Sequence, residues 1–239
     1  MADRMKLIAM VFLVAILLPF AGCNESNTDV KLKPPQQSGE IKRIENERQK
    51  AKLLRKIDSK FENPEAHYEL ARLYQADALW AKAEYHYNNT LSFEPSHKDA
   101  QAGMIKVLLS LGDTSRAEIL ADIYANQAAN SAADSLLLAL AYQQQYLDEH
   151  ALAMYNQALR LAPNSAKINR QIGYYYKSKG DNVQARNYLT RSYQLDPIQP
   201  EVAGELGRMG VVVRIPRKSS KGTKKLDKIV TESDRRLTQ

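Results

Sequence analysis

Between Pro64 and Pro197, the order of large, small and polar residues repeats every 34 residues. Four registers, 64–97, 98–131, 132–165 and 166–199, each place a large apolar residue at position 7 and an alanine at position 20. The residues at position 7 are Leu70, Met104, Leu138 and Ile172, and the alanines are Ala83, Ala117, Ala151 and Ala185. Small residues let two helices approach closely, and larger apolar side chains fill the space between neighbouring units. The pattern therefore predicts four units of two helices each.

Turn residues separate the expected helices. Gly112 and Gly180 are each followed by aspartate, an order that supplies a left-handed helix end and then the N-cap of the next helix. Prolines close three of the units, because proline has no amide hydrogen to donate and clashes inside a helix. They are Pro95, Pro163 and Pro197.

These columns resemble the tetratricopeptide-repeat family over Pro64 to Pro197. The resemblance implies an all-α superhelical solenoid of helix-turn-helix repeats, occupying residues 63–208. The second repeat departs from the pattern at Gln101, Ala121 and Ala129, so we expect its helices to pack with less bulk or to bend while the stack continues. Residues 200–208 match the start of a fifth repeat and are expected to form a capping half-repeat.

The chain begins with an apolar run of 14 residues, Leu7 to Phe20, preceded by Arg4 and Lys6. A charged start, an apolar centre and small residues after it are typical of a secretory signal, assigned here to residues 1–22. Fourteen apolar residues are too few for a transmembrane helix. The sequence therefore predicts export.

Cys23 is the single cysteine of the chain and follows this run directly. The stretch from Phe20 to Cys23 resembles the bacterial lipobox, with phenylalanine in place of the usual leucine. The resemblance implies that Cys23 is acylated on its sulfur and on its freed amine, and that Asn24 directs the protein to the outer membrane, where it faces the periplasm. A membrane-anchored or plainly cleaved signal with an incidental cysteine is the alternative.

Two further segments precede the repeats. Residues 23–40 are polar, contain a Pro-Pro pair and are expected to form an extended linker behind the lipidated cysteine. Residues 41–62 are expected to form a helix that caps the array. Its narrow apolar stripe is assigned to Ile41, Ile44, Ala51, Leu54 and Ile57.

The C-terminal segment, 209–239, is basic. From Arg208 onward, ten Lys and Arg residues face three acidic ones, a net charge of +7, whereas Cys23 to Gly207 carries 22 basic and 23 acidic residues, a net of −1. Residues 211–215 are predicted to form a short strand on the last helices, followed by a mostly disordered extension. The extension suits lipid phosphates, cell-wall anions or an acidic protein, or serves only solubility. Export argues against nucleic acid.

A repeat solenoid commonly binds a segment of another protein on the surface formed by its first helices. Family geometry points positions 2, 5, 9 and 12 of each repeat into that groove, where basic residues at both ends would flank an apolar centre. This pattern suits a partner peptide with acidic or carboxylate groups and an apolar middle, although these positions also suit plain solvated helix faces. The groove residues singled out are Tyr68, Arg72, Lys106, Leu136, Leu140, Arg170, Tyr174 and Lys177.

No enzymatic, cofactor or metal motif is recognised. The four histidines lack the H-E-x-x-H spacing, and His67 suits a packing role at position 4 of its repeat. The architecture resembles outer-membrane lipoproteins that assemble tight-adherence (Flp) pili, and the pilotins that escort a secretin. It resembles almost as well the lipoproteins that gather peptidoglycan hydrolases and synthases. A secretin or pilus-assembly subunit is the expected partner, and a homodimer stays open.

Overall fold

The computed structural model describes residues 35–214, and this part of the chain consists of ten α-helices joined by turns. The helices are α1 Pro35–Ser59, α2 Pro64–Ala76, α3 Trp80–Phe93, α4 Lys98–Leu111, α5 Thr114–Ala128, α6 Ala132–Gln144, α7 Asp148–Leu161, α8 Ala166–Ser178, α9 Asn182–Leu195 and α10 Pro200–Arg208. From Arg43 onward the chain forms one compact unit. The all-α fold class is confirmed.

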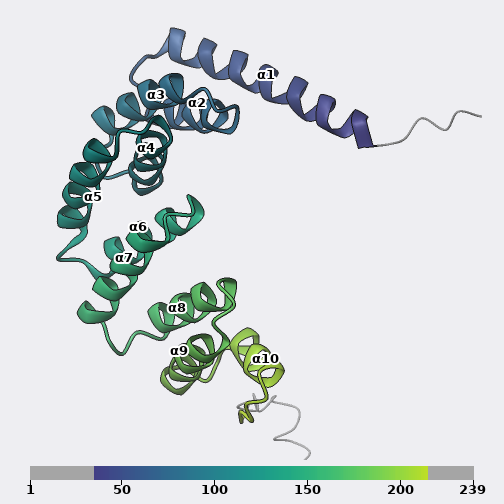
Figure 1. Cartoon of the computed structure of the whole chain (residues 1–239), viewed down its shortest axis with the longest axis vertical. Helices are drawn as coiled ribbons and strands as arrows, with labels where there is room; N and C mark the ends of the chain where they lie inside the picture. The colour runs from purple at the N-terminus through teal and green to yellow at the C-terminus, as the bar shows by residue number, and fades with distance from the viewer. Residues whose placement is uncertain (1–34, 215–239) are drawn as a thin grey trace, which may run out of the picture. The chain divides into compact units, whose positions relative to one another are not determined.

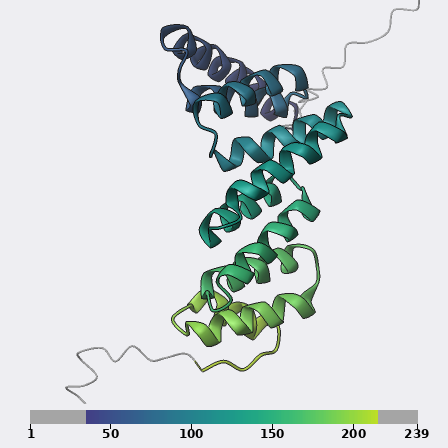
Figure 2. The ribbon, with the colours of Figure 1, turned by 90° about the vertical axis from the view of Figure 1, so that its left-hand side faces the viewer.

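The helices follow the 34-residue register. The first helices of the repeats, α2, α4, α6, α8 and α10, begin at Pro64, Lys98, Ala132, Ala166 and Pro200. The second helices α3, α5, α7 and α9 keep the same spacing. Within three repeats the two helices lie side by side, α2 with α3, α6 with α7 and α8 with α9 (Figure 1). Turned by 90°, the helix pairs succeed one another in chain order (Figure 2).

The expected turn chemistry is present in repeats 2 and 4. Gly112 and Gly180 adopt left-handed conformations, with φ of 82° and 79°. The side chains of Asp113 and Asp181 then accept hydrogen bonds from the backbone amides of Arg116 and Gln184, at 3.1 and 3.0 Å. Each aspartate thereby satisfies one of the free amides at the start of the next helix.

The corresponding turns of repeats 1 and 3 have no glycine. Ala78 and Tyr146 occupy the same position with φ of 56° and 59°. A left-handed conformation costs a residue with a side chain roughly 1–2 kcal/mol. The following residues, Leu79 and Leu147, provide no side-chain cap. Two of the four turns are therefore strained.

The small residues of the repeat pattern lie where helices meet. All four alanines of position 20 are buried. Gly173 of α8 packs so closely on α9 that an added Cβ would lie 2.7 Å from Cγ of Leu189. The interior of the array is thus set by close helix contact at these columns and by large side chains such as Tyr87 and Tyr155 between them.

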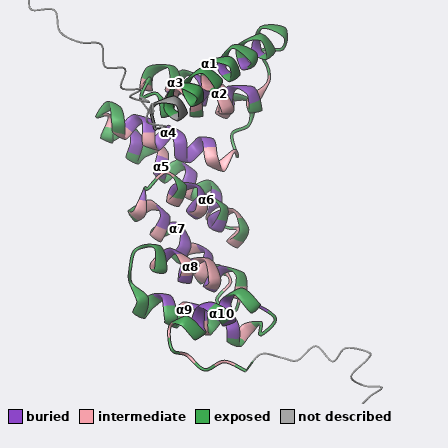
Figure 3. Ribbon diagram, turned by 90° about the vertical axis from the view of Figure 1, so that its right-hand side faces the viewer, coloured by how far each residue is buried: buried purple, intermediate pink, exposed green. Residues whose placement is uncertain are grey.

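Repeat 2 continues the stack through an unusually buried first helix. Helix α4 contacts α2, α3, α5 and α6, and buried residues run along it (Figure 3). Gly103 lies against the ring of Tyr87, where a Cβ would come within 2.3 Å of Cζ. Gln101 is buried and donates a 2.7 Å hydrogen bond to the carbonyl of Pro95. The close contact of Gly103 with Tyr87 was not among the departures on which the expectation for repeat 2 was based.

Helix α1 begins earlier than predicted, and the face that it buries differs from the predicted stripe. It begins at Pro35, inside the segment expected to be a linker, and proline is well suited to a first helical turn. Its buried apolar residues are Leu53 and Ile57, which pack with Ala66 and Leu70 of α2. The expected stripe is wrong for its other large members, because Ile41, Ile44 and Leu54 are exposed.

A lysine explains the misplaced stripe. Lys50 lies on the same face of α1 as Leu53 and Ile57 and is buried. Its ammonium group pairs with Asp77 and, at 2.7 Å, with Glu47. A charged residue on a buried face breaks the apolar pattern by which a stripe is recognised, although its methylene stem packs like an apolar side chain.

The segment after α10 docks without forming a strand. Residues 211–214 have no regular secondary structure, which corrects the strand expected for 211–215 as far as the described residues extend. Val211 and Val213 pack on a cluster that includes Leu189 and Leu206, and the hydroxyl of Tyr193 donates a 2.6 Å hydrogen bond to the carbonyl of Arg214. No strand lies among residues 35–214 for the segment to pair with, so side-chain packing and the Tyr193 hydrogen bond hold it.

Several predictions concern residues outside 35–214. The signal segment 1–22, the lipidation site Cys23, the first part of the linker and the basic extension beyond Arg214 all lie there. Within the described part, no helix combines the length and the apolar character needed to span a bilayer.

Candidate protein-binding surface

All eight predicted groove residues lie on the first helices α2, α4, α6 and α8, but their surroundings differ. On α2, the ring of Tyr68 lies 4.4 Å from that of His97, and the Arg72 guanidinium lies 5.6 Å from the Tyr68 ring centre. Burial raises the pKa of Tyr68 to about 12. Arg72 also pairs with Glu69 at 3.2 Å. This end presents an exposed arginine held against a half-buried aromatic ring.

The central residues are divided between packing and surface. Lys106 of α4 and Leu140 of α6 are half-buried. Leu136 is only 4% exposed, so it serves the core more than the surface.

The residues on α8 are already engaged by α10. Arg170 donates a 3.3 Å hydrogen bond to Gln199, and Lys177 pairs with Glu205 at 2.6 Å. Tyr174 packs on the cluster that holds α10 to α9. Sequence reasoning placed these three side chains in an open groove because it could not show that the half-repeat would pair with them or pack against them.

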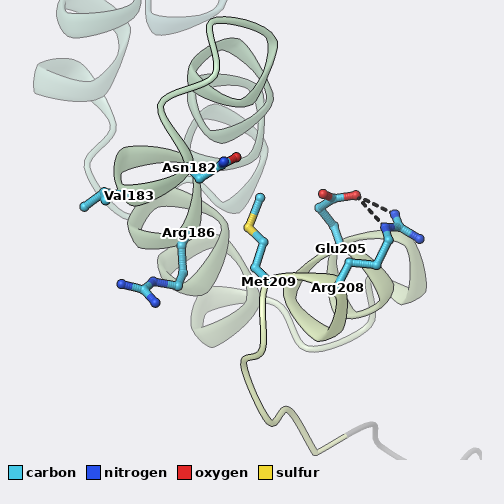
Figure 4. Close-up of a pocket in the computed structure, with 6 residues that line it drawn as sticks. All are labelled: Asn182, Val183, Arg186, Glu205, Arg208 and Met209. Carbon is cyan, nitrogen blue, oxygen red and sulfur yellow. Dashed lines mark hydrogen bonds and ion pairs between the residues drawn. The ribbon is translucent and has the colours of Figure 1, made fainter.

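Glu205 is the centre of this contact. Its side chain is buried and receives hydrogen bonds from Lys177 and Arg208, which lower the pKa of its carboxyl group. Beside it lies a pocket of about 390 Å³ between α9 and α10, in which the Glu205 carboxylate turns toward Arg208 and Arg186 lies on the other side of Met209 (Figure 4). The paired carboxylate serves to hold α10 in place.

A groove without such a cover lies between α6 and α8. Its first part is an apolar pocket of about 270 Å³ and its second part is a more polar pocket of about 540 Å³, with Leu140 lining both. We call the two together the α6/α8 groove. The apolar part is lined by Ala132, Ala133, Leu136, Leu137, Leu140, Ala162, Ser165, Lys167 and Ile168, and the polar part by Leu140, Gln143, Gln144, Tyr146, Gln171, Ser178 and Lys179.

The charge of the α6/α8 groove comes mainly from α8, which contains no acidic residue. Lys167 is exposed beside the apolar part. At the polar end, Lys179 pairs with Asp148 at 2.6 Å, and this hydrogen bond raises the pKa of Lys179. The groove therefore joins aliphatic walls to amide groups, with a net basic rim.

Sequence reasoning identified Leu136 and Leu140 of this groove and missed Tyr146, Gln171 and Lys179. Tyr146 and Lys179 lie at or beyond the ends of the first helices, outside the family positions used for the prediction. A tyrosine where two other repeats have glycine was the one available signal.

The described residues contain no cluster of three or more His, Cys, Asp or Glu side chains placed to hold a metal ion. The α6/α8 groove offers apolar contact and hydrogen bonds from side-chain amides, which suits recognition of a peptide.

No family model matches the chain. The solved structures that resemble it include TTC0263, a thermophilic TPR protein of Thermus thermophilus, with a TM-score of 0.43 and 16% identity over 75% of this chain and 98% of that one. PilF of Pseudomonas aeruginosa has a TM-score of 0.36 and 20% identity over 61% of this chain and 67% of that one.

Successive first helices begin 34 residues apart, and each repeat from 1 to 4 consists of two helices. This spacing decides the architecture. The fold is a tetratricopeptide-repeat solenoid. One curated relative, the human protein O-mannosyl-transferase TMTC1, is 23% identical over 145 residues, which are 58% of this chain. The matched residues span only 16% of that relative's length.

Proposed function

We propose that this protein is a tetratricopeptide-repeat scaffold tethered to the bacterial outer membrane, where it binds a protein partner and assists assembly or localisation of a pilus or secretion complex. The observation that carries the binding role is the α6/α8 groove, an apolar pocket continued by a more polar one between two first helices. The proposed partner is a secretin or a pilus-assembly subunit, and the chain has no catalytic role of its own in this proposal.

Residues 1–23 support the proposed membrane tether. The apolar run followed by Cys23 supports acylation, and two or more acyl chains make membrane attachment effectively stable. Pro35, the start of α1, lies only 12 positions after Cys23. Even fully extended, this stretch spans at most about 40 Å. The tether would therefore hold the start of α1 within about 40 Å of the lipid anchor.

The proposal is tested by affinity capture of the lipidated protein from its native envelope in mild detergent, with mass spectrometry of the bound proteins. The Cys23→Ser variant is captured in parallel. We expect a secretin or pilus-assembly subunit bound to the wild type, and we expect that subunit to be mislocalised in cells that carry the variant.

Two outcomes would reject the proposal. Processing of Cys23→Ser that stays sensitive to globomycin would show that Cys23 is not the lipidation site. Capture of peptidoglycan hydrolases or synthases in place of pilus or secretion subunits would assign the scaffold to cell-wall assembly.

A further inference from the structure

The outer face of α5 carries two large aliphatic side chains in contact with solvent. Ile119 and Ile123 are 59% and 44% exposed and lie one helical turn apart. The buried face of the same helix consists of three alanines and Tyr124. The larger aliphatic side chains of α5 are therefore placed outside the core, where they do not contribute to the packing of repeat 2.

The other repeats do not need aliphatic residues at these positions. The equivalents of Ile119, at position 22 of the repeat, are Tyr85, Ala153 and Asn187, and those of Ile123, at position 26, are Asn89, Gln157 and Arg191. Tyr85 is 55% exposed on α3, and an ion pair between Glu84 and Arg116 joins α3 to α5. An exposed apolar surface is thus a particular feature of repeat 2 and its neighbour in repeat 1.

Carboxylates accompany this apolar surface. Glu118 and Asp122 are exposed and also lie one turn apart, each one residue before an isoleucine. The Glu118 carboxylate lies 3.5 Å from Nε2 of His150, and no lysine or arginine among residues 35–214 pairs with Asp122. The one cation of α5, Arg116, is occupied by Glu84 and Asp113. We call Tyr85, Glu118, Ile119, Asp122 and Ile123 the α5 patch.

The chain contains a segment of complementary chemistry. Residues 217–230 hold six Lys and Arg and a single acidic residue, Asp227. They end with three aliphatic residues, Leu226, Ile229 and Val230. Basic groups are attracted by the carboxylates of the α5 patch, and aliphatic side chains remove its isoleucines from water.

This segment is long enough to reach α5 within one molecule. Contacts run without a break from α9 through α8, α7 and α6 to α5. Packed helices lie about 8–10 Å apart, so these four steps add up to at most about 40 Å. The 12 residues from Arg214 to Leu226 extend to about 40 Å. Covalent linkage gives such a segment an effective concentration on the order of millimolar, which favours its own chain over a second copy in dilute solution.

We propose that residues 217–230 bind the α5 patch of the same chain. The lysines of the segment pair with Glu118 and Asp122, and its aliphatic side chains cover Ile119 and Ile123. The α5 patch lies on a second helix, so this contact leaves the α6/α8 groove open to a partner. The bound segment is kept on the fold and away from anionic surfaces.

Zero-length cross-linking tests this contact. Unlabelled and isotope-labelled full-length chains are mixed in equal amounts in dodecyl maltoside and treated with a carbodiimide, which joins carboxylates to lysine amines that touch them. Mass spectrometry then identifies the joined peptides. We expect Glu118 and Asp122 to join to Lys224, Lys225 or Lys228 within chains of one label. The yield at Glu65, an exposed carboxylate of α2, should be at least fivefold lower.

Substitutions that copy other repeats distinguish binding from chance proximity. Ile119→Asn combined with Ile123→Gln introduces the residues that repeats 4 and 3 have at these positions and leaves every carboxylate and lysine in place. The yield at Glu118 and Asp122 should fall at least fivefold. Asp122→Asn, which copies repeats 1 and 3, should lower the yield at Glu118 at least twofold.

Leu137→Gln is the matched control, because it removes an exposed aliphatic side chain of the α6/α8 groove and introduces the residue of repeat 4. It should leave the yield unchanged. Equal yields at Glu118 and Glu65, or an unchanged yield in the double variant, would overturn the inference. Cross-links that join labelled to unlabelled chains at the random frequency would overturn the intramolecular contact and assign the segment to a second copy. The proposed scaffold function does not depend on this contact and is decided by the capture experiment alone.

Discussion

At the scale of single residues, the contact between His67 and His86 makes the stability of the core of repeat 1 depend on pH. Their Nδ1 atoms lie 2.9 Å apart, and Nε2 of His67 lies 3.1 Å from the carbonyl of Phe61. A carbonyl only accepts, so Nε2 of His67 carries the proton and its Nδ1 accepts from Nδ1 of His86. Both rings are then neutral, and protonating both would set two donors against each other. The packing role expected for His67 fits its complete burial.

Acid should destabilise the protein through this pair. Burial, followed by the charge of His67, lowers the pKa of His86 to about 4, and burial also lowers the pKa of His67. The unfolded chain therefore binds more protons below pH 6.5, and stability falls as the pH drops from there toward 4. Between pH 7 and pH 5, His86 alone should cost about 2 kcal/mol.

Urea unfolding at pH 7 and pH 5, followed by circular dichroism, measures this loss. The double variant His67→Leu and His86→Phe is the control, since it has no buried imidazole to protonate. A loss of equal size in this variant and in wild type would show that other groups cause the pH dependence.

Because two turns are strained, we expect glycine to stabilise the protein at Ala78 and Tyr146. Replacing Ala78 or Tyr146 by glycine removes the cost of a left-handed residue with a side chain, although it also increases the freedom of the unfolded chain. We expect each substitution to raise the free energy of unfolding by about 0.5–1 kcal/mol. The reciprocal changes Gly112→Ala and Gly180→Ala should lower it by about 1 kcal/mol. Urea unfolding of the four variants measures these effects, and a destabilised Ala78→Gly would refute the strain argument.

At the scale of elements, the packing of α4 on α3 depends on Gly103, although glycine has a low helix propensity. An added Cβ at Gly103 would meet the ring of Tyr87, so the ring or the helix must move. We expect Gly103→Ala to lower the free energy of unfolding by about 1–3 kcal/mol, because overpacking outweighs the better helix propensity of alanine.

Gly204 of α10 is the matched control for this substitution. A Cβ there meets nothing within 4 Å, so Gly204→Ala should stabilise the protein by about 0.5–1 kcal/mol. Chemical denaturation of both variants is sufficient, and two changes of the same sign would contradict the packing argument.

The contact of α10 with α8 also restricts which substitutions can test binding. Lys177 and Arg170 are bound to Glu205 and Gln199, so charge reversal at either residue would disturb the half-repeat as well as any partner. Lys167, which is exposed at the groove, avoids this difficulty.

At the scale of the whole molecule, a solenoid in which helices contact mainly their neighbours in the chain should lose structure locally. Leu206 is fully buried where α10 packs on α9. We expect Leu206→Ala to speed amide hydrogen exchange in α8, α9 and α10 and to leave α2 and α3 unchanged. Hydrogen exchange with mass spectrometry measures this, and a uniform increase along the chain would show that the array unfolds as one unit.

The sequence alone determined the 34-residue register, the start of the first helix of every repeat and the left-handed glycines at positions 112 and 180. These features follow from local chemistry repeated in one register, so they can be recognised before any contact is known. Tertiary structure decided which face of α1 is buried, because that face includes Lys50 paired with a residue 27 positions away. It also decided that the half-repeat pairs with Arg170 and Lys177 and packs against Tyr174, and that the α6/α8 groove ends at the strained Tyr146. Such features depend on which distant residues meet. The position of a side chain on a helix does not show whether another element packs on it.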